Sequence, residues 1–198
     1  MYLVPIYLLL LFLCLAFSIY KKKARQNFLW LYFVIVFIVE FIKIKVLKNS
    51  SSVIYTYISI TYILYFIIYY WKQKLNKIIL ILIFIISFII YIYIILNNNS
   101  TDYPTPIGII MSLSYILLAL LWYIHQLQNV DTIRILKKQA FWVSSSLLIW
   151  SVFFIFRSIP MYWLNIHDYD FLIQINFGFQ IITIFSYLLF LRGLFCKI

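Results

Sequence analysis

The stretch IILILIFIISFIIYIYIIL, residues 78–96, holds nineteen consecutive residues without a charged side chain. A helix that crosses a membrane needs about 20 mostly apolar residues, since each residue adds about 1.5 Å of length. The whole chain is similar in character, with 66% hydrophobic residues, 11% charged residues and a mean hydropathy of +1.04. Soluble domains are about half apolar and a quarter charged. The composition therefore excludes an ordinary soluble domain and indicates a membrane protein.

Six further segments of similar length and hydropathy flank this stretch. We predict an all-α integral membrane protein, a seven-transmembrane-helix bundle forming a single domain over residues 1–198. The predicted spans are residues 2–20, 28–46, 53–71, 78–96, 107–124, 140–156 and 171–191. Proline enters these runs only near an end, at Pro5, so each helix can satisfy its own backbone hydrogen bonds, as a bilayer requires. The connections are too short to bury a core of their own.

The basic residues predict the orientation of the bundle. A signal peptide carries its charges before the apolar run, whereas Lys21, Lys22, Lys23 and Arg25 follow the first run. With the N-terminus outside and the C-terminus inside, twelve of the 16 Lys and Arg residues fall in inner connections. This positive-inside bias favours that orientation in a bacterial inner membrane. The net charge of +11 then reflects topology and attraction to anionic membrane lipids, and we expect no direct contact with nucleic acid.

One connection departs from this rule, because Lys43, Lys45 and Lys48 fall outside. Lys43 and Lys45 continue the apolar pattern and could extend along it to the lipid headgroups. The alternative is that the second segment does not span the membrane fully. That would place the later basic connections outside, so we disfavour it.

Glu40 is the only glutamate and the only acidic residue within a predicted span. A charged group within a membrane is costly and often functional, so one interpretation is a proton or ion site. The other interpretation is structural: Lys43 follows three residues later on the same helical face and could pair with Glu40. Both interpretations stay open, and these two residues form the candidate intramembrane charge.

Polar residues recur at helical spacing in three other spans. Tyrosines form a stripe in the third span, and small serines in the sixth predict close helix packing. In the seventh span a polar stripe is predicted to face the bundle interior. These sets are Tyr55, Tyr62, Tyr65 and Tyr69; Ser144 and Ser151; and Asn176, Gln180 and Thr183.

The connection over residues 160–170, PMYWLNIHDYD, is the predicted outer loop for recognition, with Trp163, His167, Asp168 and Asp170 as candidates. Adjacent His-Asp-x-Asp lacks a diagnostic metal-ligand spacing, so we expect no metal. The two cysteines, Cys14 and Cys196, should lie at different depths and remain free thiols.

Motifs for catalysis or ion selectivity are not evident. The sequence contains no HExxH, nucleophile elbow, P-loop or selectivity-filter pattern. Nothing therefore argues for an enzyme, and we expect no cofactor.

Residues 138–150, KQAFWVSSSLLIW, and the ending RGLFCK, residues 192–197, resemble small uncharacterised multi-span membrane proteins of Bacteroidetes-type bacteria. Related membrane regions are found with histidine kinases. The resemblance covers about the last third of the chain. It implies a sensory or accessory module acting through a cytoplasmic or membrane protein partner. A homo-oligomeric pore or defence-associated effector, and a small ion-coupled transporter, are the alternatives.

Overall fold

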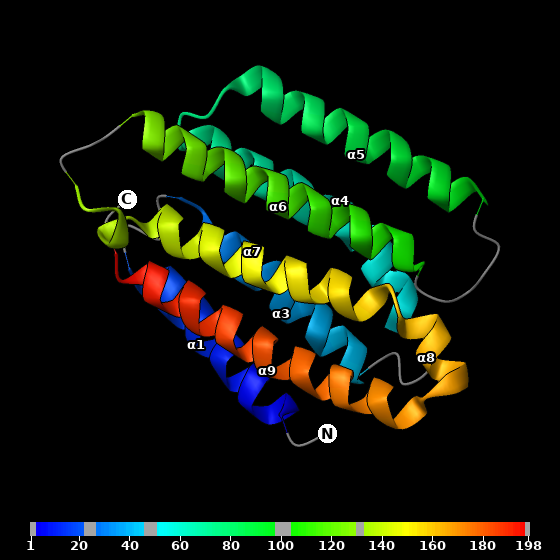
Figure 1. Ribbon diagram of the computed structural model, residues 1–198. Coiled ribbons are helices and arrows are strands. Elements are labelled where there is room, and N and C mark those ends of the chain that lie inside the picture. Colours follow the sequence, from blue (N-terminus) through cyan, green and yellow to red (C-terminus); the bar gives the residue numbers. More distant parts are fainter. Residues whose placement is uncertain (1–2, 22–26, 46–50, 98–103, 130–132, 197–198) are drawn as a thin grey trace.

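The computed structural model describes residues 3–21, 27–45, 51–97, 104–129 and 133–196. Within these ranges the fold is all-α, with eight α-helices and one short 3-10 helix (Figure 1). The helices are α1 (Val4–Tyr20), α3 (Leu29–Lys45), α4 (Ser51–Lys72), α5 (Lys77–Asn97), α6 (Thr105–Gln128), α7 (Gln139–Ser158), α8 (Met161–His167) and α9 (Tyr169–Leu194), with the 3-10 helix η1 at Ile135–Lys137.

Each of the seven apolar segments coincides with a helix, and the predicted all-α class is confirmed. Five of the described helices, α4, α5, α6, α7 and α9, are long and apolar enough to cross a membrane. The described parts of α1 and α3 are apolar but shorter. Length and composition thus indicate a membrane protein.

The prediction of a loop between α7 and α9 is wrong, because this segment contains the helix α8. Pro160 precedes the first helical residue, where a missing N–H is tolerated. Asp168 then separates α8 from α9 and caps α9, since its carboxylate accepts the Phe171 N–H at 3.0 Å. Two helices therefore meet where the polar composition suggested an irregular loop.

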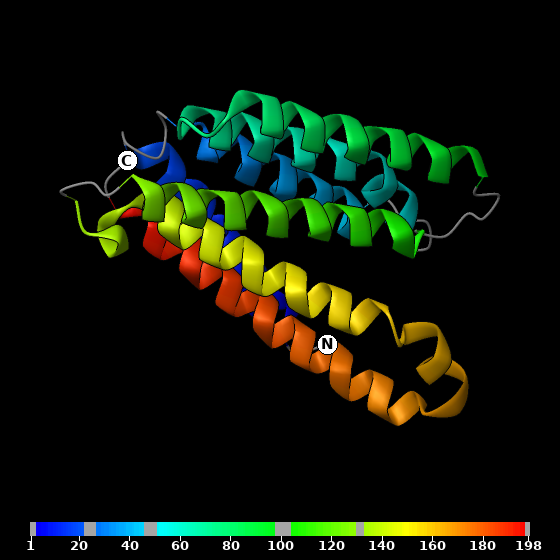
Figure 2. The same ribbon diagram turned by 45° about the horizontal axis from the view of Figure 1, so that its top comes forward.

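The long helices run side by side in the bundle, with α7 packed between α6 and α9 (Figures 1 and 2). α1 packs against α3 and α9, and α4 packs against α3, α5 and α6. In the view of Figure 2, the α8 end of α7 and α9 leans away from α5 and α6. α5 lies at the periphery, and most of its apolar side chains are exposed, as expected for a helix that faces lipid.

Aromatic rings fill the centre of the bundle around Phe66, which is fully buried. Its ring centroid lies 5.0 Å from those of Tyr32, Tyr65 and Tyr115, and 6.5 Å from those of Tyr69 and Phe190. These rings come from α3, α4, α6 and α9, so the aromatic cluster joins four helices.

Serine contacts allow the helices to approach one another closely. The Ser146 and Ser186 hydroxyls, from α7 and α9, are 2.6 Å apart, and each also lies within hydrogen-bonding distance of the other residue's backbone carbonyl oxygen, at 2.8 and 3.2 Å. Ser144 and Ser151 of the predicted serine set are both fully buried on α7. Small hydroxylated residues at such interfaces are typical of membrane helices.

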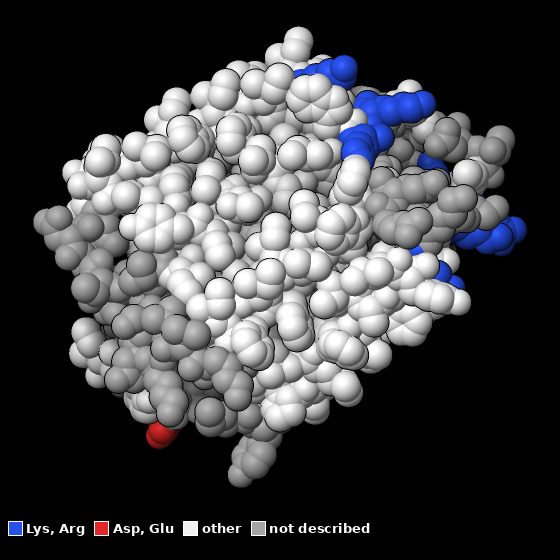
Figure 3. Space-filling view, turned by 180° about the vertical axis from the view of Figure 1, so that it is seen from behind, with Lys and Arg blue, Asp and Glu red and all other residues white. Residues whose placement is uncertain are grey.

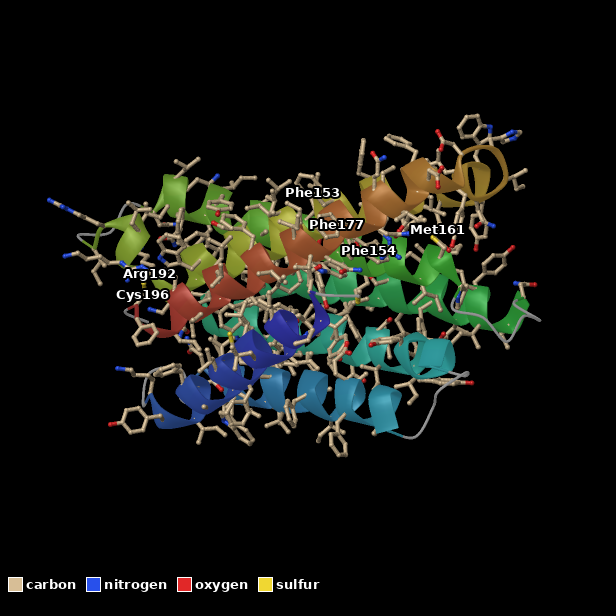
Figure 4. The ribbon with its side chains drawn as sticks, turned by 90° about the horizontal axis from the view of Figure 1, so that it is seen from below. Phe153, Phe154, Met161, Phe177, Arg192 and Cys196 are labelled. Atoms are coloured by element: carbon tan, nitrogen blue, oxygen red, sulfur yellow. The ribbon has the colours of Figure 1, made fainter. Side chains whose placement is uncertain are left out.

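Both cysteines are free and buried, which confirms the expectation that they do not pair. The Cys14 thiol faces the Tyr187 carbonyl oxygen at 3.6 Å. Cys196 lies at the far end of α9, beside Arg192 (Figure 4).

Lys and Arg side chains gather at one end of the bundle, here called the basic end, and Figure 3 shows this on one face. The described cations at the helix termini and connections there are Lys21, Lys72, Lys74, Lys77, Arg134, Lys137, Lys138 and Arg192. Asp168 and Asp170 lie beside α8, at the opposite end.

Candidate functional site

Glu40 lies half-buried on α3, five residues before its last residue. Its Oε1 accepts a hydrogen bond of 2.7 Å from the Tyr55 hydroxyl on α4. The same oxygen accepts a longer bond of 3.3 Å from the Tyr7 hydroxyl on α1. The carboxylate therefore links three helices.

Tyr187 on α9 extends this contact toward the middle of the bundle. Its ring meets the Tyr7 ring edge-on at 5.2 Å. The Phe190 ring, also on α9, lies 6.1 Å from the Tyr187 ring and 5.7 Å from the Tyr32 ring on α3. We call Tyr55, Glu40, Tyr7, Tyr187 and Tyr32 the Glu40–tyrosine chain, and it connects α1, α3, α4 and α9.

Beyond Tyr32, the last member of this chain, lie two further tyrosines of α4, Tyr65 and Tyr69. The Tyr65 ring stacks on that of Tyr32 at 5.4 Å with a 26° tilt. The hydroxyls of Tyr65 and Tyr69, one turn apart on α4, are buried and have no hydrogen-bond partner. Buried polar groups are usually satisfied, so these two hydroxyls are exceptions to the usual pattern.

Further hydrogen bonds between helices lie nearer the basic end. Tyr70 shares a bond of 2.7 Å with Ser144 on α7. At the start of α7, Gln139 accepts from Asn27 at 2.7 Å, and its own amide nitrogen is buried without a partner. Polar groups thus occur at successive depths from Glu40 to the basic end.

The predicted Glu40–Lys43 pair stays a prediction, because the Lys43 side chain lies outside the described residues. The sequence identified Glu40 but missed its partner Tyr7, and it missed Tyr187, whose ring contacts that of Tyr7. Antiparallel spans place residues near opposite termini at the same level of the membrane. The position of each tyrosine along its predicted span could therefore have indicated these contacts. Tyr55 of the predicted stripe does contact Glu40, through the hydrogen bond that its hydroxyl donates.

The polar stripe on α9 is half-buried. The Asn176 side-chain oxygen accepts a bond of 2.6 Å from the Arg157 Nε on α7, and Arg157 also lies over the Phe179 ring at 5.0 Å. Thr183 donates to the Phe179 carbonyl of its own helix. Around this contact Phe153 and Phe177 are exposed on the neighbouring helices α7 and α9 (Figure 4). A shared site for Asn176, Gln180 and Thr183 stays a prediction.

The four candidates at α8 are all exposed. The Trp163 and His167 rings lie 4.8 Å apart on one face of α8, and Asp168 serves as the cap of α9. Among the described residues, no group of three His, Cys, Asp or Glu side chains could hold a metal ion. A recognition role for this segment stays a prediction.

No family model, no curated protein and no solved structure matches the chain. The resemblance to small multi-span membrane proteins of bacteria therefore also stays a prediction.

We expect Glu40→Ala to lower the free energy of unfolding by about 1–2 kcal/mol, because it removes the acceptor of the Tyr55 and Tyr7 hydroxyls. Glu40→Gln should cost less than half as much, since its amide oxygen can accept the same bonds. Thermal unfolding of the purified variants in detergent measures both. Equal stability of wild type and Glu40→Ala would show that the carboxylate does not hold the helices together.

Proposed function

We propose that the protein is a non-enzymatic sensory or accessory subunit with seven spans in a bacterial inner membrane. Its N-terminus lies outside, and its C-terminus and basic end lie inside, where they meet a cytoplasmic partner. The observation that carries the proposal is the Glu40–tyrosine chain, since the Glu40 hydrogen bonds link α1, α3 and α4, and the Tyr7–Tyr187 ring contact adds α9. Three of these helices, α1, α4 and α9, end near the basic residues.

The basic end offers a surface on which a partner could dock. Several of its cations lie over aromatic rings, an arrangement that restrains a flexible side chain. The pairs are Lys21 on Phe195 at 5.0 Å, Lys72 on Phe28 at 3.7 Å, Lys77 on Trp71 at 5.3 Å and Arg192 on Trp142 at 5.8 Å. The positive-inside rule places such residues in the cytoplasm, where an acidic protein surface complements them.

A signal would act by changing the hydrogen bonds of Glu40. Breaking the contacts with Tyr7 and Tyr55 releases α1 and α4 from α3. A change in helix packing at one end can bias the arrangement at the other if the bundle has two stable packings. The basic end would then present its cations differently to the partner.

Native mass spectrometry after gentle extraction from the protein's own membrane tests the proposal. We expect a stoichiometric soluble partner with the wild type and at least tenfold less with the double variant Arg134→Gln and Lys137→Gln. Gln128→Ala, at an exposed neutral residue at the end of α6, should keep the partner. A ring of identical subunits without a partner would contradict the accessory role and favour a pore-forming or defence-associated effector.

A second candidate function is ion-coupled transport, favoured by the Glu40 carboxylate within an apolar helix. Glu40→Gln separates the two functions. It should abolish proton-coupled transport and leave partner docking nearly unchanged.

A further inference from the structure

We propose that Arg157 binds the phosphate of an anionic phospholipid at the α8 end of the bundle, with the acyl chains of the lipid against exposed rings of α7. This contact lies at the end opposite the basic end. It needs neither the protein partner nor the ion-coupled transport proposed above, so it can be tested independently of both.

The Arg157 side chain is positioned by two contacts with α9. Its Nε donates to the Asn176 side-chain oxygen at 2.6 Å, and its guanidinium carbon lies 5.0 Å from the centre of the Phe179 ring. An arginine carries five N–H donors in one plane, and Asn176 takes only one of them. The two contacts therefore orient the guanidinium and leave its two terminal nitrogens for another acceptor.

The charge of Arg157 has no anionic partner among the residues that the structure describes. Arg157 is half-buried at the end of an apolar helix, and a charge in such a place is costly unless it is paired. A guanidinium binds phosphate through two parallel N–H···O bonds, a geometry that a lysine does not offer. Phospholipids supply this phosphate at the membrane surface, so the unpaired cation and the lipid headgroup complement each other.

The position of Arg157 along α7 matches the level of the lipid headgroups. From Gln139 to Arg157, α7 advances eighteen residues, about 27 Å at 1.5 Å per residue. The hydrocarbon core of a bilayer is about 30 Å thick, so the two ends of α7 lie close to the two membrane surfaces when the helix crosses it. Lys138 precedes one end and Arg157 lies at the other, and long cationic side chains at helix ends reach the headgroups.

Exposed aromatic rings beside Arg157 provide a surface for the acyl chains. Phe153 lies one helical turn before Arg157 on α7, and Phe156 directly precedes it; both rings are exposed. On α9, Phe177 is exposed next to Asn176 (Figure 4). A phospholipid is anionic at one end and apolar at the other, and Arg157 with these rings offers the complementary arrangement.

Photolabelling in vesicles tests the site. The purified full chain is reconstituted into phosphatidylcholine vesicles that contain a trace of phosphatidylglycerol with a photoreactive diazirine in its acyl chain, and mass spectrometry of the digested protein locates the label. We expect at least fivefold more label on residues 152–159 than with phosphatidylcholine that carries the same diazirine, because the choline cation opposes Arg157. Arg157→Gln should lower the label from phosphatidylglycerol to the phosphatidylcholine level.

Arg192→Gln is the matched control, because it removes the same charge from the other end of α9 (Figure 4), where Arg192 also lies over an aromatic ring. It should leave the label on residues 152–159 unchanged, and so should an excess of inorganic phosphate. Equal labelling in the wild type and Arg157→Gln would overturn the proposal, and loss of the label on adding phosphate would assign Arg157 to a free anion instead.

The comparison of the two headgroups needs only the wild type, so it decides the question even if Arg157→Gln does not fold. Equal labelling of residues 152–159 by phosphatidylglycerol and phosphatidylcholine would show that Arg157 does not select an anionic lipid, and this result too would overturn the proposal.

Discussion

Phe66→Ala is expected to lower the free energy of unfolding by about 3–5 kcal/mol, the usual cost of removing a buried aromatic ring. Phe66 is fully buried, and ring partners from α3, α6 and α9 surround it. Lipid tails are as apolar as the side chains, so helix association in a bilayer depends mainly on close packing. The cavity left by the ring removes many packing contacts at once.

Unfolding of the purified protein in detergent, followed by heat or by added sodium dodecyl sulfate, measures this loss. Phe153→Ala is the matched control, since Phe153 lies on the long helix α7 with 43% of its surface exposed. It removes the same atoms from a lipid-facing position and should cost less than about 1 kcal/mol. Equal losses for the two variants would show that the aromatic cluster does not organise the bundle.

The helical segments could be predicted from the sequence because length and hydropathy are local properties. All seven predicted segments contain a helix, with ends that differ by a few residues. The importance of Phe66 could not be predicted, since phenylalanine is common in every apolar run of this chain. Which phenylalanine becomes central depends on how α4 is rotated against its neighbours, and hydropathy does not contain that information.

The candidate site was predictable only in part for a related reason. Glu40 stood out because acids are rare in apolar helices, and Lys43 was the natural partner to consider because it lies on the same helix. The partners that the structure places on Glu40 are Tyr7 and Tyr55, one of them 33 residues away in the chain. Contacts between helices depend on tertiary packing, which a single sequence with eighteen tyrosines does not specify.

The segment between α7 and α9 shows the opposite difficulty. Its aromatic, amide and charged side chains alternate without a clear apolar stripe, so the sequence favoured an irregular loop. In the structure the buried Leu164 anchors one turn of α8, while Pro160 and Asp168 bound the helix. One buried residue within seven was too weak a pattern to detect against polar neighbours.

Ser146→Leu is expected to prevent stable association of α7 and α9, with a loss of about 3 kcal/mol or more. Ser146 is fully buried, and its hydroxyl lies 2.6 Å from that of Ser186. A leucine side chain at this position would have to enter the space that the neighbouring helix occupies. The two helices would separate, and the reciprocal bonds between the two serines would be lost together.

Ser146→Ala separates the effect of bulk from that of hydrogen bonding. It removes the hydroxyl but leaves the helices free to stay close, and the Ser186 hydroxyl can still donate to the backbone carbonyl of residue 146. Its cost should be about 0.5–1 kcal/mol, the usual value of one hydrogen bond between membrane helices. Elution as a single folded species and the unfolding midpoint in detergent report both changes. If the leucine variant is as stable as the alanine variant, α7 and α9 do not depend on close approach at Ser146, and the serine contact would be incidental to the fold.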